Sequence, residues 1–141
     1  MFRKVMLFMV VTALLAISVN AFAAKKMQFI VTSPDAQTQM MAMVLSMMSK
    51  KKGAEVDIVL CGPGGELAVK GSKETIFMPP KKSPQMILKA LIKQGVKVEV
   101  CPLFLPAKGM KKDILIKGVN VAKPPVVAGE MVKETTEVVT F

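Results

Sequence analysis

Short apolar segments with strand character alternate along this chain with segments of helical periodicity, and this alternation limits the fold more than any other feature. Residues 27–32, 56–60 and 96–100 are rich in β-branched side chains and stop at turn-forming residues. Residues 36–50, and a segment that opens at Ser83-Pro84, carry apolar side chains at helical spacing. Such alternation favours a parallel sheet covered by helices on both sides, which is an α/β fold.

The sequence also predicts where several elements begin and end. Ser33 is expected to cap the first helix. Residues 75–78 can form an additional strand, and a weak strand is expected at residues 114–116. A further helix is expected after Pro124-Pro125, followed by a closing strand at residues 137–141.

The first residues of the chain predict export. Met1–Lys4 is positively charged, residues 5–19 are almost entirely apolar, and Ala21-Phe22-Ala23 supplies a small-x-small cleavage site. We therefore expect a signal peptide at residues 1–23, one domain at residues 24–141, and a periplasmic or secreted protein without stable membrane insertion after cleavage. The alternative is an uncleaved apolar anchor.

Composition excludes several classes of function. With 52% apolar and 21% charged residues the chain is neither disordered nor a polytopic membrane protein. The absence of histidine excludes Ser-His-Asp and Cys-His catalysis and His-ligated zinc or haem. The net charge of +10 comes almost wholly from scattered lysines, with Arg3 as the one arginine, so no nucleic-acid partner is expected.

No cofactor or metal is expected either. The five methionines within residues 40–48 raise the alternative of a thioether copper site. They spread over most of a helix instead of converging on one point. An apolar face that packs on the sheet or on a second subunit explains them better, and it favours a homo-oligomer.

The two cysteines of the chain each follow a predicted strand directly. Ligands of open parallel sheets bind at the carboxyl ends of the strands, so Cys61 and Cys101 are candidate functional residues. Because successive strand residues point to opposite faces, Cys101 is expected on the same face as Lys97 and Glu99, which is the more polar face of the sheet. The alternatives are buried structural cysteines and a disulfide, which requires that the two strands be neighbours.

The segments that follow the cysteines refine these expectations. The glycines after Cys61 lack the pattern of a phosphate-binding loop and are interpreted as a plain turn. Pro106 limits any helix after Cys101 to a few residues, so residues 103–105 are expected to form an apolar loop over the thiol. Lys108 and Lys111, together with Lys112, lie close in sequence and could stabilise a thiolate.

The chain resembles the DsrE/DsrF-like family, which includes the sulfur-relay proteins DsrE and TusD. The segments that carry the resemblance are Gly95–Cys101, Lys108-Gly109-Met110, Ile116–Val119, Thr136–Phe141 and Ile58–Gly62. It implies a three-layer α/β/α fold with a mostly parallel sheet of about five strands, usually assembled into oligomers. It also implies that Cys101 accepts a sulfane sulfur as a persulfide and passes it on.

Together these features predict an exported DsrE-like protein that binds or relays sulfane sulfur on Cys101, as a sulfur carrier or sulfurtransferase. Its partners would be further copies of itself and a sulfur donor or acceptor protein. Cys61 matches no catalytic position common to the family. The alternatives are a non-catalytic oligomeric binding module with structural or bridged cysteines and, third, a thiol-disulfide function that uses both.

Overall fold

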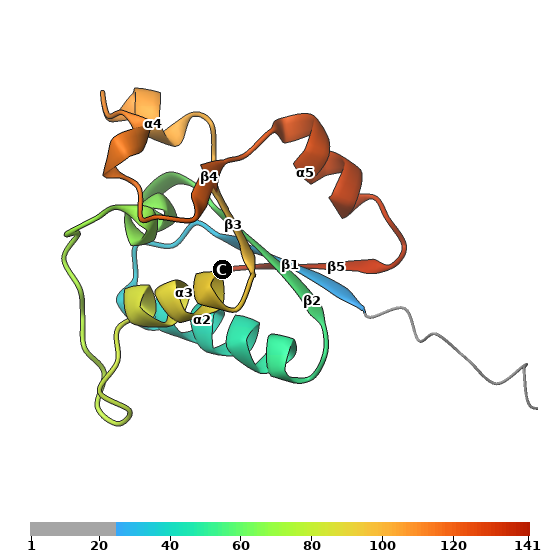
Figure 1. The fold of residues 1–141 in the computed structure, drawn as a ribbon, viewed down its shortest axis with the longest axis horizontal. Coiled ribbons are helices and arrows are strands. Elements are labelled where there is room, and N and C mark those ends of the chain that lie inside the picture. The colour runs from blue at the N-terminus through green and yellow to red at the C-terminus, as the bar shows by residue number, and fades with distance from the viewer. Residues whose placement is uncertain (1–24) are drawn as a thin grey trace, which may run out of the picture.

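A computed structural model describes residues 25–141 as one parallel α/β sheet with its connections (Figure 1). The signal peptide predicted at residues 1–23 lies outside the described residues. The sheet has five strands, all parallel, in the order β4-β3-β2-β1-β5. The strands are β1 (Lys26–Val31), β2 (Glu55–Leu60), β3 (Lys97–Val100), β4 (Val119–Val121) and β5 (Thr136–Thr140).

Helices cover both faces of this sheet, which confirms the three-layer α/β/α prediction. Figure 1 shows α2 and α3 on one face and α5 on the other. The helices are α2 (Ala36–Lys51), α3 (Pro84–Lys93), the single turn α4 (Phe104–Ala107) and α5 (Pro124–Met131), with 3-10 segments η1 (Gly62–Ala68) and η2 (Lys112–Ile114). In the described part of the chain no helix combines the length and the apolar character needed to cross a bilayer.

The main core lies between the sheet and the pair α2 and α3. Because successive strand residues point to opposite faces, every second residue of the central strands enters this core. Its buried members include Phe29, Val31, Val56, Ile58, Leu60, Val98 and Val100 from the strands and Met40, Met43, Leu88 and Leu91 from the helices.

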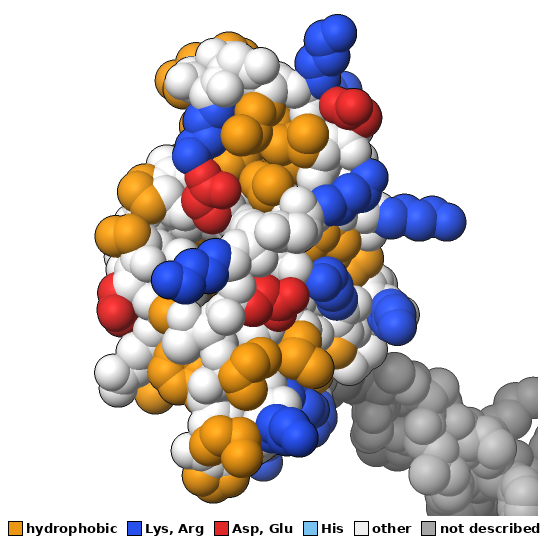
Figure 2. Space-filling model, turned by 90° about the vertical axis from the view of Figure 1, so that its left-hand side faces the viewer, with side chains coloured by type: hydrophobic (Ala, Val, Ile, Leu, Met, Phe, Trp, Pro, Cys, Tyr) orange, Lys and Arg blue, Asp and Glu red, His pale blue; other side chains and the backbone are white. Residues whose placement is uncertain are grey.

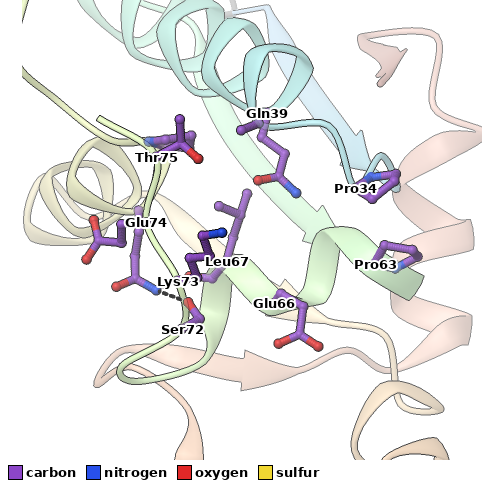
Figure 3. A pocket seen from close by; sticks show the side chains of 12 residues that line it. Pro34, Gln39, Pro63, Glu66, Leu67, Ser72, Lys73, Glu74 and Thr75 are labelled. Carbon is purple, nitrogen blue, oxygen red and sulfur yellow. Dashed lines mark hydrogen bonds between the residues drawn. The ribbon is translucent and has the colours of Figure 1, made fainter. Parts of the chain in front are cut away.

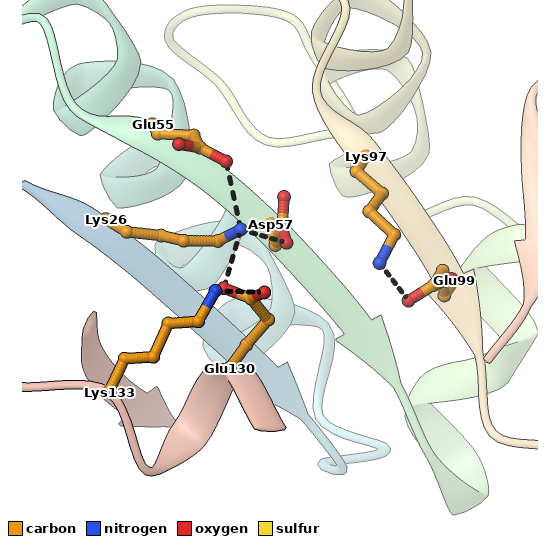
Figure 4. Close-up of polar contacts among 7 residues, drawn as sticks. All are labelled: Lys26, Glu55, Asp57, Lys97, Glu99, Glu130 and Lys133. Carbon is orange, nitrogen blue, oxygen red and sulfur yellow. Dashed lines mark hydrogen bonds and ion pairs between the residues drawn. The ribbon is translucent and has the colours of Figure 1, made fainter. Parts of the chain in front are cut away.

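The opposite face of the sheet is polar although α5 covers part of it. Lys26 on β1 forms ion pairs with Glu55 (2.9 Å), Asp57 (3.0 Å) and Glu130 (3.1 Å), and Glu130 belongs to α5 (Figure 4). This group of four side chains, called the Lys26 cluster below, therefore joins β1, β2 and α5. On β3, Lys97 pairs with Glu99 at 3.0 Å.

The start of α2 differs from the prediction. Asp35, not Ser33, is the N-cap: its carboxylate accepts a hydrogen bond from the backbone N–H of Thr38 at 2.7 Å. This contact lowers the pKa of Asp35, because the hydrogen bond favours the charged carboxylate. Ser33 instead accepts the N–H of Asp35 at 3.1 Å. At α3 the prediction is confirmed, since Ser83 is the cap.

The two additional strands were predicted wrongly. Residues 75–78 contain no strand, only a single bridge between Phe77 and Lys82 that encloses Pro79-Pro80. Proline has no N–H to donate to a sheet. Residues 114–116 do not join the sheet because their backbone bonds to the end of η1: the N–H of Ile116 donates to Ala68 (2.8 Å). The fourth strand begins later, at Val119.

Candidate active site

Cys61 and Cys101 lie side by side at the carboxyl edge of the sheet. Their strands β2 and β3 are neighbours, and the last paired residues in register are Leu60 and Val100. The next residue on each strand is a cysteine. The N–H of Cys101 donates to the carbonyl of Leu60 at 2.9 Å, and the N–H of Cys61 donates to Val31 at the same distance, so the ladder holds both cysteines.

Continued one residue past the strand ends, the alternation puts both cysteines in step with the polar face of the sheet: Asp57 lies four residues before Cys61, and Glu99 lies two residues before Cys101. Both carboxylates are buried, whereas the two cysteines are half-buried. The thiols are therefore sheltered by the protein but remain within reach of solvent.

The backbone turns away immediately after each cysteine, in the same manner on both strands. The carbonyl of Cys61 accepts the N–H of Gly64 at 3.0 Å, and the carbonyl of Cys101 accepts the N–H of Phe104 at 3.0 Å. Each cysteine is thus the first residue of a tight turn, which leads into η1 after Cys61 and into α4 after Cys101.

Close packing accounts for the glycines that follow Cys61. A Cβ atom on Gly64 would lie 2.3 Å from the carbonyl oxygen of Val31, and one on Gly65 would lie 2.4 Å from the ring of Phe104. No L side chain fits at these distances. The glycines therefore let η1 pack against the end of β1 and against α4, and this agrees with the interpretation as a turn.

The segment after Cys101 is helical for one turn, so the expectation of a loop over the thiol is only partly right. Phe104 and Leu105 are buried in the core, and Leu103 is 72% exposed. A three-residue apolar cover is therefore wrong. Phe104 is drawn inward because the bare backbone at Gly65 leaves room for its ring.

The predicted lysines lie at different places. The Lys108 ammonium forms an ion pair with Glu66 of η1 and lies 5.5 Å from the centre of the Phe104 ring. It links α4 to η1, and its charge is already shared with a carboxylate. Lys111 is exposed and precedes η2.

The environment raises the pKa of the Cys61 thiol to about 11. Burial is the main cause, because it disfavours the charged thiolate; the charge of Cys101 and a hydrogen bond with its side chain add to the effect. Cys61 is therefore a protonated thiol at neutral pH, next to Cys101 on the neighbouring strand.

A cavity of about 450 Å³ opens at the same edge of the molecule. It lies between the β1–α2 loop, η1 and the segment before α3; Figure 3 shows Gln39, Glu66 and Lys73 around it. Figure 2, which views this edge, shows apolar patches separated by charged side chains. Glu66 lines the cavity and also binds Lys108, so it connects the cavity to α4.

Sequence reasoning missed this cavity because residues 66–82 have no clear periodicity. One available signal was Gln85 in the first turn of α3, a polar residue at a buried position. Its amide donates to the carbonyls of Leu67 and Val69 and to Ser72, and so holds the cavity wall in place. Within residues 25–141 no three His, Cys, Asp or Glu side chains come together in a way that could hold a metal ion.

Comparison with known proteins assigns the chain to a family. Residues 25–141 match the sequence model of the DsrE/DsrF-like family. The chain belongs to this family. DsrE-like proteins generally serve in sulfur relay. No curated protein matches the sequence.

Two solved structures share the DsrE-like fold of this chain. The ychN protein from E. coli superposes with a TM-score of 0.69 at 17% identity, covering 84% of this chain and 99% of that one. The protein of unknown function MTH1491 from Methanobacterium thermoautotrophicum gives 0.63 at 18% identity, covering 82% and 98%. At these identities the likeness concerns the fold alone.

Proposed function

We propose that this DsrE-like protein accepts a sulfane sulfur atom on Cys101 as a persulfide and transfers it to an acceptor. The observation that carries the proposal is the position of Cys101, half-buried at the carboxyl end of β3 in an all-parallel sheet. Open α/β sheets bind their ligands at this edge. Membership of a family generally engaged in sulfur relay supports the same residue.

The transfer needs only a thiolate and a donor. The Cys101 thiolate attacks the outer sulfur of a donor persulfide, R–S–SH. A new bond forms between that sulfur and the Cys101 Sγ, the S–S bond of the donor breaks, and the donor leaves as the thiolate RS⁻. The reverse chemistry on an acceptor thiol passes the sulfur on. No net oxidation occurs.

The surroundings of Cys101 suit a carrier. The Cys101 thiol is half-buried, so the protein shelters it in part and a partner can still reach it. Because the neighbouring Cys61 is protonated, it does not compete for the donor at neutral pH. The cavity beside η1 lies at the same edge of the sheet, but neither cysteine lines it.

Intact-protein mass spectrometry after incubation with glutathione persulfide tests the proposal. Cys61→Ser, which keeps Cys101 as the reactive thiol, should gain about 32 Da, one sulfur atom, as exchange chemistry requires. Cys101→Ser, the matched control, should show no gain. Equal adducts on the two variants would contradict the assignment. A protein that is bridged as isolated and takes up no sulfur after reduction would favour the alternative, a binding module with structural or bridged cysteines.

Export from the cytoplasm is part of the same proposal. The segment at residues 1–23 has the composition of a signal peptide, and we propose that the protein acts outside the cytoplasm. The mass of the protein recovered from its own compartment tests this, since cleavage after Ala23 leaves a chain that begins at Ala24. A full-length mass would favour the retained anchor instead.

A further inference from the structure

The two cysteines are close enough to react with each other. Neighbouring strands of a sheet lie about 4.8 Å apart, and disulfides join residues whose Cα atoms are about 4.4–6.8 Å apart. Cys61 and Cys101 follow the last paired residues of β2 and β3 and project from the same face. The raised pKa of the Cys61 thiol has Cys101 among its causes, which agrees with this proximity.

A second thiol beside a persulfide changes what the persulfide can do. The inner sulfur of a persulfide is bonded to a good leaving group, hydrogen sulfide, which has a low pKa compared with an ordinary thiol. A thiolate that attacks this inner sulfur displaces sulfide and forms a disulfide. A carrier that only transfers sulfur needs no such neighbour.

We propose that Cys61 is a resolving thiol that discharges the Cys101 persulfide as sulfide, so that the protein reduces sulfane sulfur as well as carrying it. This inference rests on the proposed function, because it begins from the persulfide on Cys101. The persulfide reacts as its anion, Cys101–S–S⁻: Cys61 passes its proton to the terminal sulfur, and the Cys61 Sγ attacks the Cys101 Sγ. The bond between the Cys101 Sγ and the terminal sulfur breaks, and HS⁻ leaves. The sulfane sulfur is reduced, and the two cysteines are oxidised to a disulfide.

The order of events follows from the surroundings of Cys61. In the resting protein burial and the adjacent Cys101 keep Cys61 protonated, so the donor meets Cys101 first. In the persulfide anion the negative charge lies on the terminal sulfur, one bond farther from Cys61 than the Cys101 Sγ. This weakens the repulsion that opposes ionisation of Cys61. The resolving step is thus favoured only after sulfur has been loaded.

The cycle closes with a dithiol reductant. Such a reductant attacks the Cys61–Cys101 disulfide, passes through a mixed disulfide, and returns both cysteines to thiols while it becomes a disulfide itself. The half-buried position of the pair leaves the disulfide accessible to a protein dithiol at the rim. A single turnover needs no reductant, and this simplifies the test.

The test is a single turnover of the reduced, full-length protein with one equivalent of glutathione persulfide. Glutathione persulfide leaves as glutathione, so sulfide above that of a Cys101→Ser sample reports the resolving step. Wild type should release sulfide, lose about 2 Da, and yield a peptide in which Cys61 and Cys101 are joined. Cys61→Ser should instead retain the adduct of about 32 Da and release no excess sulfide.

The outcomes separate the two proposals. A wild-type protein that keeps its adduct, with no disulfide and no excess sulfide, overturns the resolving role but leaves the carrier function intact. A Cys61→Ser protein that takes up no sulfur at all contradicts the carrier function itself. Cys61→Ala provides a second variant if the serine does not fold, and the wild-type measurement stands without either.

Discussion

Cys61 and Cys101 differ in chemistry although they are neighbours, and the difference should affect stability. The pKa of the Cys61 thiol in the folded protein is about 11, above its ordinary value of 9.0. Below pH 9 both the folded and the unfolded thiol are protonated, and the contribution to stability is complete. Between pH 9 and 11 the unfolded thiol loses its proton first, so this contribution is lost as the pH rises.

We therefore expect the free energy of unfolding of the reduced wild type to fall more steeply from pH 8.5 to 11 than that of Cys61→Ala. Urea titrations at several pH values under reducing conditions measure it. The variant is the control, since it keeps every lysine and Cys101. Parallel pH profiles for the two proteins would show that Cys61 titrates normally in the folded state.

Gly65 and Gly129 form a matched pair for testing the packing of α4. In Gly65→Ala the new methyl group would collide with the Phe104 ring, and overpacking of this kind costs about 1–3 kcal/mol. Gly129 lies within α5 with open space around it, so Gly129→Ala should stabilise by up to about 1 kcal/mol. Chemical denaturation distinguishes the two, and equal effects would contradict the packing described here.

At the scale of elements, the Lys26 cluster joins β1, β2 and α5. Burial by itself lowers the pKa of the Lys26 ammonium, but hydrogen bonds to Glu55, Asp57 and Glu130 outweigh it and raise the pKa. The pKa of Glu130 is lowered, first by Lys133 and then by Lys26. The lysine thus stays charged and neutralises the buried carboxylate of Asp57.

Lys26→Met keeps the aliphatic stem but leaves the buried Asp57 carboxylate without its cation. Loss of one partner of a buried pair costs about 3 kcal/mol, so we expect a large decrease in the free energy of unfolding. Lys25→Met is the matched control: its pair with Glu137 is exposed on both sides and should contribute no more than about 1 kcal/mol. Similar losses in the two variants would argue against a structural role for the cluster.

The sequence predicts elements well where periodicity and capping agree, and poorly where distant contacts decide. The strands that end at Leu60 and Val100 and the helix capped by Ser83 follow from local pattern and are confirmed. The cap of α2 was misassigned because Ser33, Pro34 and Asp35 all suit a helix start, and only the geometry of the Thr38 N–H selects Asp35.

The candidate site is less readable from the sequence. The position of each cysteine at a strand end is a local feature, and it was predicted. That Cys61 and Cys101 are neighbours depends on the strand order, which no local pattern encodes. The pairing of Lys108 with Glu66 likewise joins residues far apart in the chain. Long-range packing therefore determines the strand order and the Lys108–Glu66 ion pair, which local sequence patterns do not predict.

At the scale of the whole molecule, apolar side chains remain exposed on the outer surface of α2 and α3. Met41, Leu45 and Met48 of α2 and Met86 of α3 are among them. Grooves of about 660 and 480 Å³ follow these residues, and Val44 and Pro80 line both. A continuous apolar surface of this kind is typical of subunit contacts, and we propose that a second copy of the chain covers it.

Light scattering after size-exclusion chromatography should then give a mass above that of one chain. Met48→Glu places a charge on the proposed contact and should shift the protein toward monomer. Val132→Glu is the control, because Val132 is 82% exposed and follows α5 on the other face of the sheet. A monomeric wild type would contradict the assembly, and identical masses for all three proteins would contradict this contact surface.

The adjacency of β2 and β3 has a thermodynamic consequence. Cys61 precedes the whole connection through α3, and Cys101 follows it, so a bond between them closes a ring of about 40 residues, which is worth roughly 4 kcal/mol through the entropy of the unfolded chain. Oxidised protein should melt at a higher temperature than reduced protein, a gap that Cys61→Ala abolishes. Calorimetry with and without reductant measures this; coincident transitions would mean that no ring has formed. The oxidised protein that remains after sulfide release would then resist proteases better than the reduced protein that has not yet accepted sulfur.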